Sequence, residues 1–467
     1  MRLRPLALAL LAAGLAVPAS AADLLQAYEL ARKGDPQLAA AEARAAAAEA
    51  GVSRARAVLL PQVNATASLT DNEGDSTSFS SRPDGAGGVV FDRNTGSSDS
   101  RSRRYGLNLS QTLYDHSDYT QLKAARAAAA EAEAQRIAAE QSLAVRVATA
   151  YFNTLTAIES LASARAQEAA AKRQLDQAET RLEVGLAPIT DVHEARASYD
   201  GARANAISAA TRLDDAREAL AEITGEPLDS LKGLGTDYQP KLDDTEGLQA
   251  WVDKALAGNP TLQAAALALD GAEANVSSAR AGHLPTLSLS GGYNDSATWG
   301  NNTSAGVTFP SDNLNDGHNV GITLTVPIFS GGAVQAGVRQ ALANRDATAE
   351  QLEQQRRSIT RQTRNAYRSL AAGAAEVEAR RLAVVSAKAA LEAGEAGLEV
   401  GTRTVVDVLL AQQTLFAAQT QFAQARHNFL VNELSLKQAA GSLSPADIEA
   451  VNRLLSADAE ASLDATK

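Results

Sequence analysis

One uninterrupted helical segment limits what this chain can fold into. From His116 to Val184 the sequence contains neither proline nor glycine, and apolar or small residues recur at helical spacing among alanine, glutamate, glutamine and arginine. At 1.5 Å per residue, this segment predicts one helix of roughly 100 Å. A second segment of the same kind runs from Val334 to about Val400. Helices of this length exclude a compact globular domain.

Each long helix is followed by a tight turn and a returning helix. The turns lie in two matching sequences, EVGLAPITDVH and EVGTRTVVDVL, in which Gly185 and Gly401 are the predicted hairpin turn formers. The sequence therefore predicts two long antiparallel helical hairpins. They cover residues 116–223, with a tip near 185–191, and residues 334–440, with a tip near 401–407.

The two halves of the chain repeat each other. GDPQL from Gly34 matches GNPTL from Gly258, and LLPQVNATASL from Leu59 matches HLPTLSLSGGY from His283, in the same order as the two turns. In each half, Asp35 and Asn259 precede a proline and predict a helix start. The predicted divisions are a first structural repeat over 22–225, an equatorial linker over 226–247, a second repeat over 248–441, and a C-terminal equatorial segment and tail over 442–467.

Four shorter segments change from helical spacing to strict alternation of apolar with small polar residues. They predict strands at about 60–72, 103–114, 284–298 and 318–329. Their lengths suit a tilted strand that crosses a bilayer, with one face for lipid and one for water. The Asp-, Ser- and Gly-rich segments after Asp71 and Asn294 are interpreted as exposed surface loops. Ordinary soluble hairpins fit the same alternation.

Charge and targeting features limit the compartment and the partners. Residues 1–21 have the charged, apolar and small-residue order of a secretory signal peptide, and the chain contains no cysteine for a lipid or a disulfide. Outside that segment, no apolar run approaches the roughly 18 to 20 residues of a membrane-spanning helix. The net charge of −12 argues against nucleic acid as a partner.

A four-stranded sheet with free edges is unstable in lipid, because its edge amides and carbonyls have no partners there. Under a membrane interpretation, the strands must therefore close with strands from other copies. Three copies would give twelve strands around a water-filled lumen, whereas two would give eight strands and a lumen filled by side chains. We expect an α+β membrane protein that forms a homotrimer.

Several sequences resemble the TolC family of outer-membrane efflux proteins over essentially the whole mature chain. They are VGTRTVVDVL, AQARHNFLVNELSLKQAAGSL, VGLAPITDVHEARASYD and DLLQAYELARKGDPQL. The resemblance implies a 12-stranded β-barrel, four strands per chain, in the outer membrane of a Gram-negative bacterium. The barrel would continue as a long α-helical coiled-coil barrel across the periplasm. Such a homotrimeric channel is the passive exit duct of tripartite multidrug efflux or type I protein secretion systems, and its partners are a periplasmic adaptor (membrane fusion) protein and an inner-membrane efflux pump or ABC transporter.

The resemblance also implies that the helical tips gate the periplasmic entrance. Arg403, Thr190 and Asp191 would hold the closed state through charge-assisted bonds between hairpins, and three copies of Asp407 would form an acidic ring at the entrance. The chain departs from the best-known members at Leu398 and Leu410, where they carry a tyrosine and a second acidic residue. Local helix chemistry is the alternative role for these residues. Thr190 or Asp191 would be a helix N-cap, Asp407 would lie near a helix start, and Arg403 would lie close to a preceding helix end.

The sequence gives no sign of catalysis, and we expect neither an enzyme nor a bound cofactor. Phosphate loops, nucleophile elbows and dinucleotide fingerprints do not occur in it. The histidines are too widely spaced for a metal site on a helix face. They are His116, His193, His283, His318 and His427. The main competing hypothesis is a soluble periplasmic coiled-coil adaptor, in which the strands form a small soluble domain.

Overall fold

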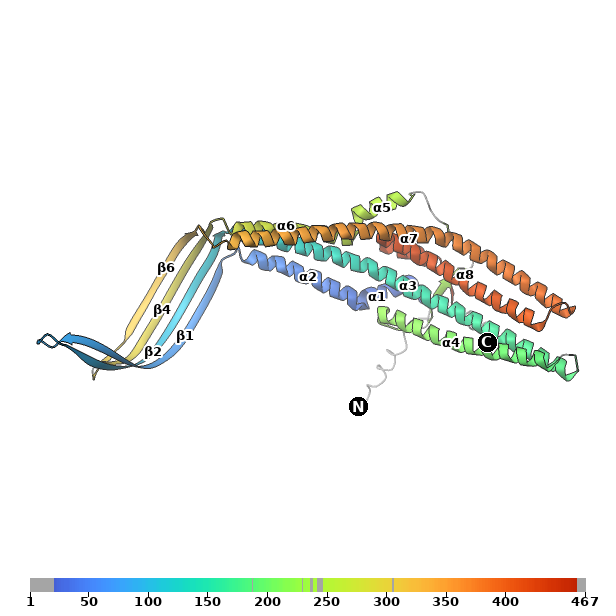
Figure 1. Cartoon of the computed structure of the whole chain (residues 1–467), viewed down its shortest axis with the longest axis horizontal. Helices are drawn as coiled ribbons and strands as arrows, with labels where there is room; N and C mark the ends of the chain where they lie inside the picture. The colour runs from blue at the N-terminus through green and yellow to red at the C-terminus, as the bar shows by residue number, and fades with distance from the viewer. Residues whose placement is uncertain are drawn as a thin grey trace, which may run out of the picture. The chain divides into compact units, whose positions relative to one another are not determined.

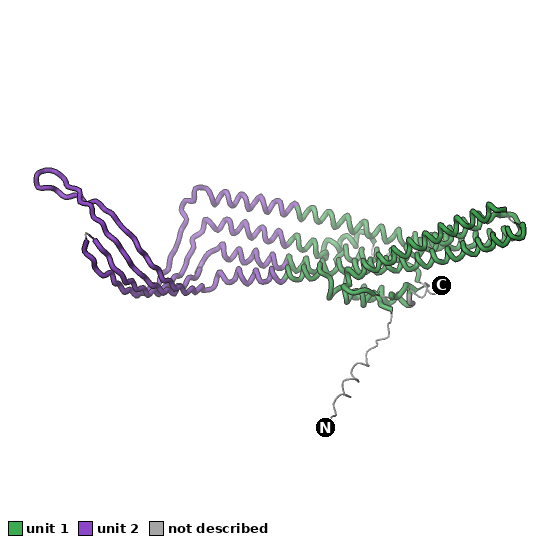
Figure 2. The backbone as a smooth tube through the Cα atoms, turned by 90° about the horizontal axis from the view of Figure 1, so that it is seen from below, with its two compact units in different colours: residues 1–45, 131–266, 351–467 green, residues 46–130, 267–350 purple. Residues whose placement is uncertain are grey.

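The computed structural model describes residues 21–186, 188–228, 230–235, 238–241, 247–304 and 306–459. The predicted signal peptide, except Ala21, lies outside these ranges, and so do parts of the predicted linker and residues 460–467 of the predicted tail. The chain divides into two compact units (Figure 2). Unit 1 comprises residues 1–45, 131–266 and 351–467, and unit 2 comprises residues 46–130 and 267–350. In the described part of the chain, no helix combines the length and the apolar character needed to span a bilayer.

Unit 2 contains an antiparallel sheet with the order β1-β2-β4-β6, in which short β5 also pairs with β4 (Figure 1). The strands are β1 (Gln62–Pro83), β2 (Val89–Tyr114), β4 (Thr286–Ser304), β5 (Val307–Pro310) and β6 (Asn313–Thr325). Within this sheet, β1 and β6 each have only one described neighbour along most of their length. Both long edges are therefore open in the single chain.

The predicted apolar alternation lines up across the sheet. Val63 lies opposite Leu109 and Leu289 lies opposite Ile322, so apolar side chains from neighbouring strands share one face. These side chains are exposed in the single chain: Val63 has 60% and Ile322 has 67% of its surface accessible. Burying such a face requires an apolar environment from outside the chain.

The structure contradicts the predicted long surface loops. The Asp- and Ser-rich segment after Asp71 continues β1 to Pro83, and it pairs residue by residue with β2 from Val89 onward. Only five residues remain as a turn, in which Asp84 accepts the amides of Ala86 (2.8 Å) and Gly88 (2.7 Å). Serine and threonine tolerate the extended backbone, and pairing within a hairpin satisfies its amides and carbonyls. In the second repeat, β4 likewise continues through Asn294 to Ser304.

The helices that contribute to unit 1 include the two long hairpins. The first hairpin joins α3 (His116–Glu183) to α4 (Ile189–Thr224), and the second joins α7 (Ala333–Glu399) to α8 (Val405–Ala439). The shorter helices are α1 (Leu24–Gly34), α2 (Pro36–Ala57), α5 (Gly247–Gly258), α6 (Pro260–Ala281) and α9 (Pro445–Asn452). As the sequence predicted, Asp35 and Asn259 cap α2 and α6, accepting the amides of Leu38 (2.7 Å) and Thr261 (2.9 Å).

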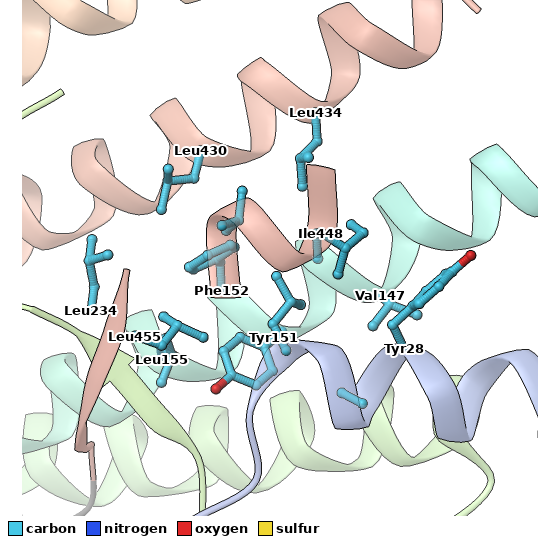
Figure 3. Packing of buried hydrophobic residues seen from close by; sticks show 14 of the residues in the cluster. Tyr28, Val147, Tyr151, Phe152, Leu155, Leu234, Leu430, Leu434, Ile448 and Leu455 are labelled. Atoms are coloured by element: carbon cyan, nitrogen blue, oxygen red, sulfur yellow. The ribbon is translucent and has the colours of Figure 1, made fainter. Parts of the chain in front are cut away.

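The main hydrophobic core of unit 1 lies where the hairpins meet the short helices (Figure 3). Tyr151, Phe152 and Leu155 of α3 are almost fully buried there, together with Leu430 of α8 and Ile448 of α9. β3 (Lys232–Leu234) pairs antiparallel with β7 (Leu455–Asp458) beside this core. The inter-repeat segment and the C-terminal segment therefore meet and anchor the two hairpins at one level.

Candidate functional site

The first helical tip is a glycine turn. Gly185 has a φ of 75°, its amide donates to the carbonyl of Leu182 (2.9 Å), and the amide of Leu186 donates to the carbonyl of Arg181 (2.8 Å). This arrangement satisfies the last carbonyls of α3 and requires the left-handed backbone that glycine adopts without strain. The turn ends at Pro188, the residue before α4.

The second tip repeats the glycine turn but begins its returning helix differently. Gly401 has a φ of 79°, and the amide of Thr402 donates to the carbonyl of Gly397 (2.8 Å). Thr404 is the N-cap of α8 and forms a capping box with Asp407. The amide of Thr404 donates to the Asp407 carboxylate (2.9 Å), and the amide of Asp407 donates to the Thr404 hydroxyl (3.2 Å). The capping role that was an alternative for Asp407 is therefore present.

The same bonds set the charge of Asp407. Hydrogen bonds from the Thr404 amide and hydroxyl, followed by the positive charge of Arg403, lower the pKa of the Asp407 carboxyl below its ordinary value. Asp407 is consequently ionised at neutral pH. A carboxylate with these properties is fixed in position as well as in charge.

Thr190 and Asp191 do not cap α4, contrary to the capping alternative. Pro188 is the N-cap and makes no side-chain capping bond, because proline has no side-chain acceptor and its fixed φ already suits the helix entry. Among the described residues, the Thr190 hydroxyl makes only a long contact, 3.5 Å, with the Asp191 carboxylate. Within the described residues of this single chain, no hydrogen bond or ion pair joins either residue to Arg403.

Arg403 is exposed and lies against the end of α7. Its amide donates to the carbonyl of Gly397 (3.1 Å), and a Cβ added at Gly397 would come within 2.7 Å of the Arg403 Cγ. The absence of a side chain at Gly397 therefore leaves room for the Arg403 stem. Sequence reasoning did not single out Gly397, although its position one helical turn before Gly401 was visible.

A groove of about 600 Å³ separates α3 from α7 near the tips. Its α3 side includes Asp176, Thr180 and Arg181, and its α7 side includes Leu398 and Glu399. Leu398 thus faces the first hairpin across this groove. Its side chain has no hydroxyl with which to form a bond there.

Two contacts between the paired helices of each hairpin were not predicted from the sequence. Arg196 of α4 forms an ion pair with Glu179 of α3 (2.7 Å), and Arg380 of α7 donates to Gln421 of α8 (2.6 Å). In an antiparallel hairpin, residues at equal distances from the turn lie side by side. Counting outward from the two turns would have suggested both pairs.

The histidines contribute no candidate metal centre. His427 is buried in the core, where its ring stacks on Phe152 and its Nδ1 lies 2.8 Å from the Thr156 hydroxyl. Burial, with the nearby positive charge of Arg426, lowers the pKa of His427 to about 3. No group of three or more potential metal ligands occurs among the residues that the structure describes. His427 thus functions as a neutral core residue.

The sequence matches the family described as outer membrane efflux protein over residues 27–226 and 251–442, one match in each repeat. The chain is 38% identical to the outer membrane protein TolC of Vibrio cholerae, and the alignment covers 92% of this chain and 93% of that protein. Escherichia coli TolC is 36% identical, with 97% and 89% covered. The alkaline protease secretion protein AprF of Pseudomonas aeruginosa is 31% identical, with 93% and 87% covered.

Solved structures share the fold. The Campylobacter jejuni CmeC outer membrane channel has a TM-score of 0.73 at 20% identity, covering 93% of this chain and 90% of that one. The outer membrane protein VceC of Vibrio cholerae has a TM-score of 0.69 at 21% identity, covering 90% and 96%. These findings give no support to the soluble adaptor hypothesis. The chain belongs to the outer membrane efflux protein family, and it is a transport protein of the outer membrane.

Proposed function

We propose that three copies of this chain form the exit duct of a tripartite efflux or type I secretion system. The sheet of unit 2 carries this proposal, because it combines an exposed apolar face with two open long edges. An exposed sheet of this kind is unfavourable in water, and in lipid its edge amides and carbonyls need partners. Lipid against the apolar face and neighbouring copies at the edges satisfy both requirements.

Closure with three copies gives a twelve-stranded barrel. In that arrangement, the open edge of β6 pairs with the open edge of β1 in the next copy, so every long edge has a partner. Twelve strands leave an aqueous lumen. The long hairpins then continue the lumen as a helical tunnel in the periplasm, anchored by the core around Tyr151.

The helical tips act as the gate of this tunnel. Arg403 of one hairpin donates to Thr190 and Asp191 of neighbouring hairpins, partly across subunits, because its guanidinium is exposed and their acceptors are not used to cap α4. Three ionised copies of Asp407 form an acidic ring that attracts cations. Leu398 offers no additional bond, so the closed state depends mainly on Arg403.

The tips also present the surface that a periplasmic adaptor protein would contact. Val184, Leu186 and Val400 have 64%, 79% and 76% of their surfaces exposed. Apolar residues exposed at a rigid turn are suited to a protein contact. The adaptor would connect the duct to an inner-membrane efflux pump or ABC transporter, which supplies the energy. The duct itself binds no cofactor and catalyses no reaction in this proposal.

Single-channel recording of the purified protein in planar bilayers tests the proposal. We expect the wild type to give a small, cation-preferring conductance, which increases in Arg403→Ser because the gate loses its donor. Arg381→Ser is a matched control, because Arg381 is paired with Glu378 on α7 away from the tip, and we expect wild-type conductance from it. Folded protein that gives no current would refute the duct, whereas equal currents in all three proteins would refute only the role of Arg403.

A further inference from the structure

The middle of α7 carries an exposed row of arginines. Arg357, Arg361, Arg364 and Arg368, here called the arginine stripe, follow one another at spacings of three and four residues and are all exposed. All the residues that line the shallow hollow over this stripe come from α7 itself. Arg357 pairs with Glu353 of the same helix (2.8 Å), and the other three make no ion pair with any residue that the structure describes.

The arginine stripe lies opposite the packed face of α7. Ile359, Thr363 and Leu370 are buried on that helix, and the groove beside Ile359 is shared with residues of α3 and α8. At 100° per residue, the centre of the stripe lies roughly 150° from the centre of this buried face. The neighbours within the chain therefore cover one side of α7, and the arginines occupy the other side.

α4 has a stripe of the opposite sign. Asp215, Glu218 and Glu222, here called the acidic stripe, are exposed and make no ion pair within the described chain. Leu213 and Leu220 mark the buried side of α4, and the acidic stripe lies on the opposite side of the helix. Figure 1 places α4 and α7 on opposite flanks of the paired hairpins in unit 1.

The two stripes lie at the same level along the hairpins. The Thr154 hydroxyl donates to the carbonyl of Ala216 (3.2 Å), which aligns α3 with α4 near the start of the acidic stripe. On the same level, His427 of α8 lies against Thr156. A Cβ at Gly373 of α7 would lie 3.6 Å from Phe429 of α8. Through these contacts, Gly373 of α7 and Ala216 of α4 lie at the same height along the hairpins.

Distances along α4 and α7 from this shared level, measured away from the tips, predict which residues of the two stripes pair. At 1.5 Å per residue, Glu218 and Glu222 lie about 3 and 9 Å beyond the Ala216 level. Arg368 and Arg364 lie about 7.5 and 13.5 Å beyond the Gly373 level. The offset is less than one turn, and the four-residue spacing is the same on both helices. Arg368 can therefore meet Glu218 while Arg364 meets Glu222.

We propose that the arginine stripe of α7 docks on the acidic stripe of α4 in a second copy of this chain. A single chain cannot join its own opposite flanks, but a rotational arrangement of copies brings α7 of one beside α4 of the next at every interface. The contact is heterologous, so it fixes the order and register of neighbouring subunits. This inference rests on the proposed trimer and adds the residues that align its helical part.

The absence of cysteine in the chain allows a direct test by disulfide crosslinking. Arg368→Cys combined with Glu218→Cys, oxidised in native membranes, is expected to give covalently linked chains on non-reducing gels. Arg381→Cys combined with Glu218→Cys is the control, because Arg381 lies about 20 Å further along α7 on a different face, and it should remain monomeric on such gels. Equal crosslinking in both pairs, or none in the first pair while the trimer is intact, would overturn the docking.

Charge reversal tests the same contact without cysteine. Arg364→Glu with Arg368→Glu is expected to cause loss of the trimer in detergent, because each interface then brings like charges together. Adding Glu218→Arg and Glu222→Arg to the same chain should restore the trimer. Loss without restoration, or no loss, would refute the pairing. A trimer that conducts but lacks these contacts would leave the proposed duct standing, whereas a monomeric wild type would refute both.

Discussion

The ion pair between Asp35 and Arg146 offers a quantitative test of how the first hairpin is anchored. The Asp35 side chain is 2% exposed and performs two tasks: it caps α2 through the amide of Leu38 (2.7 Å) and accepts two hydrogen bonds of 3.0 Å from Arg146 of α3. Burial raises the pKa of Asp35, but the bonds from Arg146 and Leu38 outweigh it, so the pKa is lowered overall. Replacing Asp35 separates the two tasks.

Asp35→Asn keeps an acceptor for the cap and removes the charge. Because the Arg146 side chain is 28% exposed, the fully buried value of 3–5 kcal/mol does not apply, and we expect a loss of about 1.5–3 kcal/mol in unfolding free energy. Asp35→Ala also removes the cap and should cost about 1 kcal/mol more. Asn259 is the natural control. It caps α6 at the equivalent position, and its amide donates to the carbonyl of Ala439 instead of accepting from an arginine.

Trp251 provides the assay, because it packs against the core of unit 1. In a Trp299→Phe background, which leaves Trp251 as the only tryptophan, denaturant unfolding at a fixed protein concentration reports the stability of that core. The lowered pKa means that Asp35 stabilises the fold above its ordinary pKa and loses this effect as the pH falls through the folded value. The wild type and Asp35→Asn should therefore converge at low pH. A cost below about 0.5 kcal/mol at neutral pH, or additive effects of Asp35→Asn and Arg146→Gln, would refute the reasoning.

Three further predictions concern the core and the tips. The buried His427 has a folded pKa of about 3, which is below its unfolded value. The stability that it contributes is therefore present above pH 6.5 and declines as the pH falls below that value. In wild type, the midpoint of denaturant unfolding should fall between pH 7 and pH 5, and His427→Gln should reduce this fall. Gly397→Ala should displace Arg403 and raise the single-channel conductance, whereas Gly394→Ala, where a Cβ has its nearest contact at 3.9 Å, should leave it unchanged. Thr404→Ala should remove about 1 kcal/mol of capping, which amide hydrogen exchange would detect as faster exchange in the first turn of α8 and not elsewhere.

The sequence predicted the helical elements well because their signals are local. The segment from His116 to Val184 became α3, which ends at Glu183, since nothing in it can break a helix. The strands were predicted too short on their outer sides, because Ser, Asp and Gly were interpreted as loop formers. In β1 and β2, those residues are held by pairing along the whole hairpin, and a long antiparallel partner is a tertiary effect that local composition does not report.

The location of the candidate site at the two helical tips was predictable from the sequence, but the contacts made there were only partly predictable. The glycine turns at Gly185 and Gly401 follow from backbone requirements that the sequence displays directly. The close approach of Arg403 to Gly397 depends on how the turn folds back on α7, and no periodicity encodes it. The gate bonds of Arg403 remain a prediction, because they would form between neighbouring hairpins and largely between copies.

The two tips arise from duplicated sequences, but their returning helices begin differently, and this leaves different side-chain groups exposed. A charge-assisted bond between two tips needs a donor on one tip and an acceptor on the other. In this chain, Asp407 is engaged by the capping box of α8, which leaves Arg403 as the exposed donor of the second tip. The N-cap of α4 is Pro188, so the side-chain oxygens of Thr190 and Asp191 are not used for capping. One tip thus presents a donor and the other presents acceptors, which is the difference that the proposed gate bond between neighbouring hairpins requires.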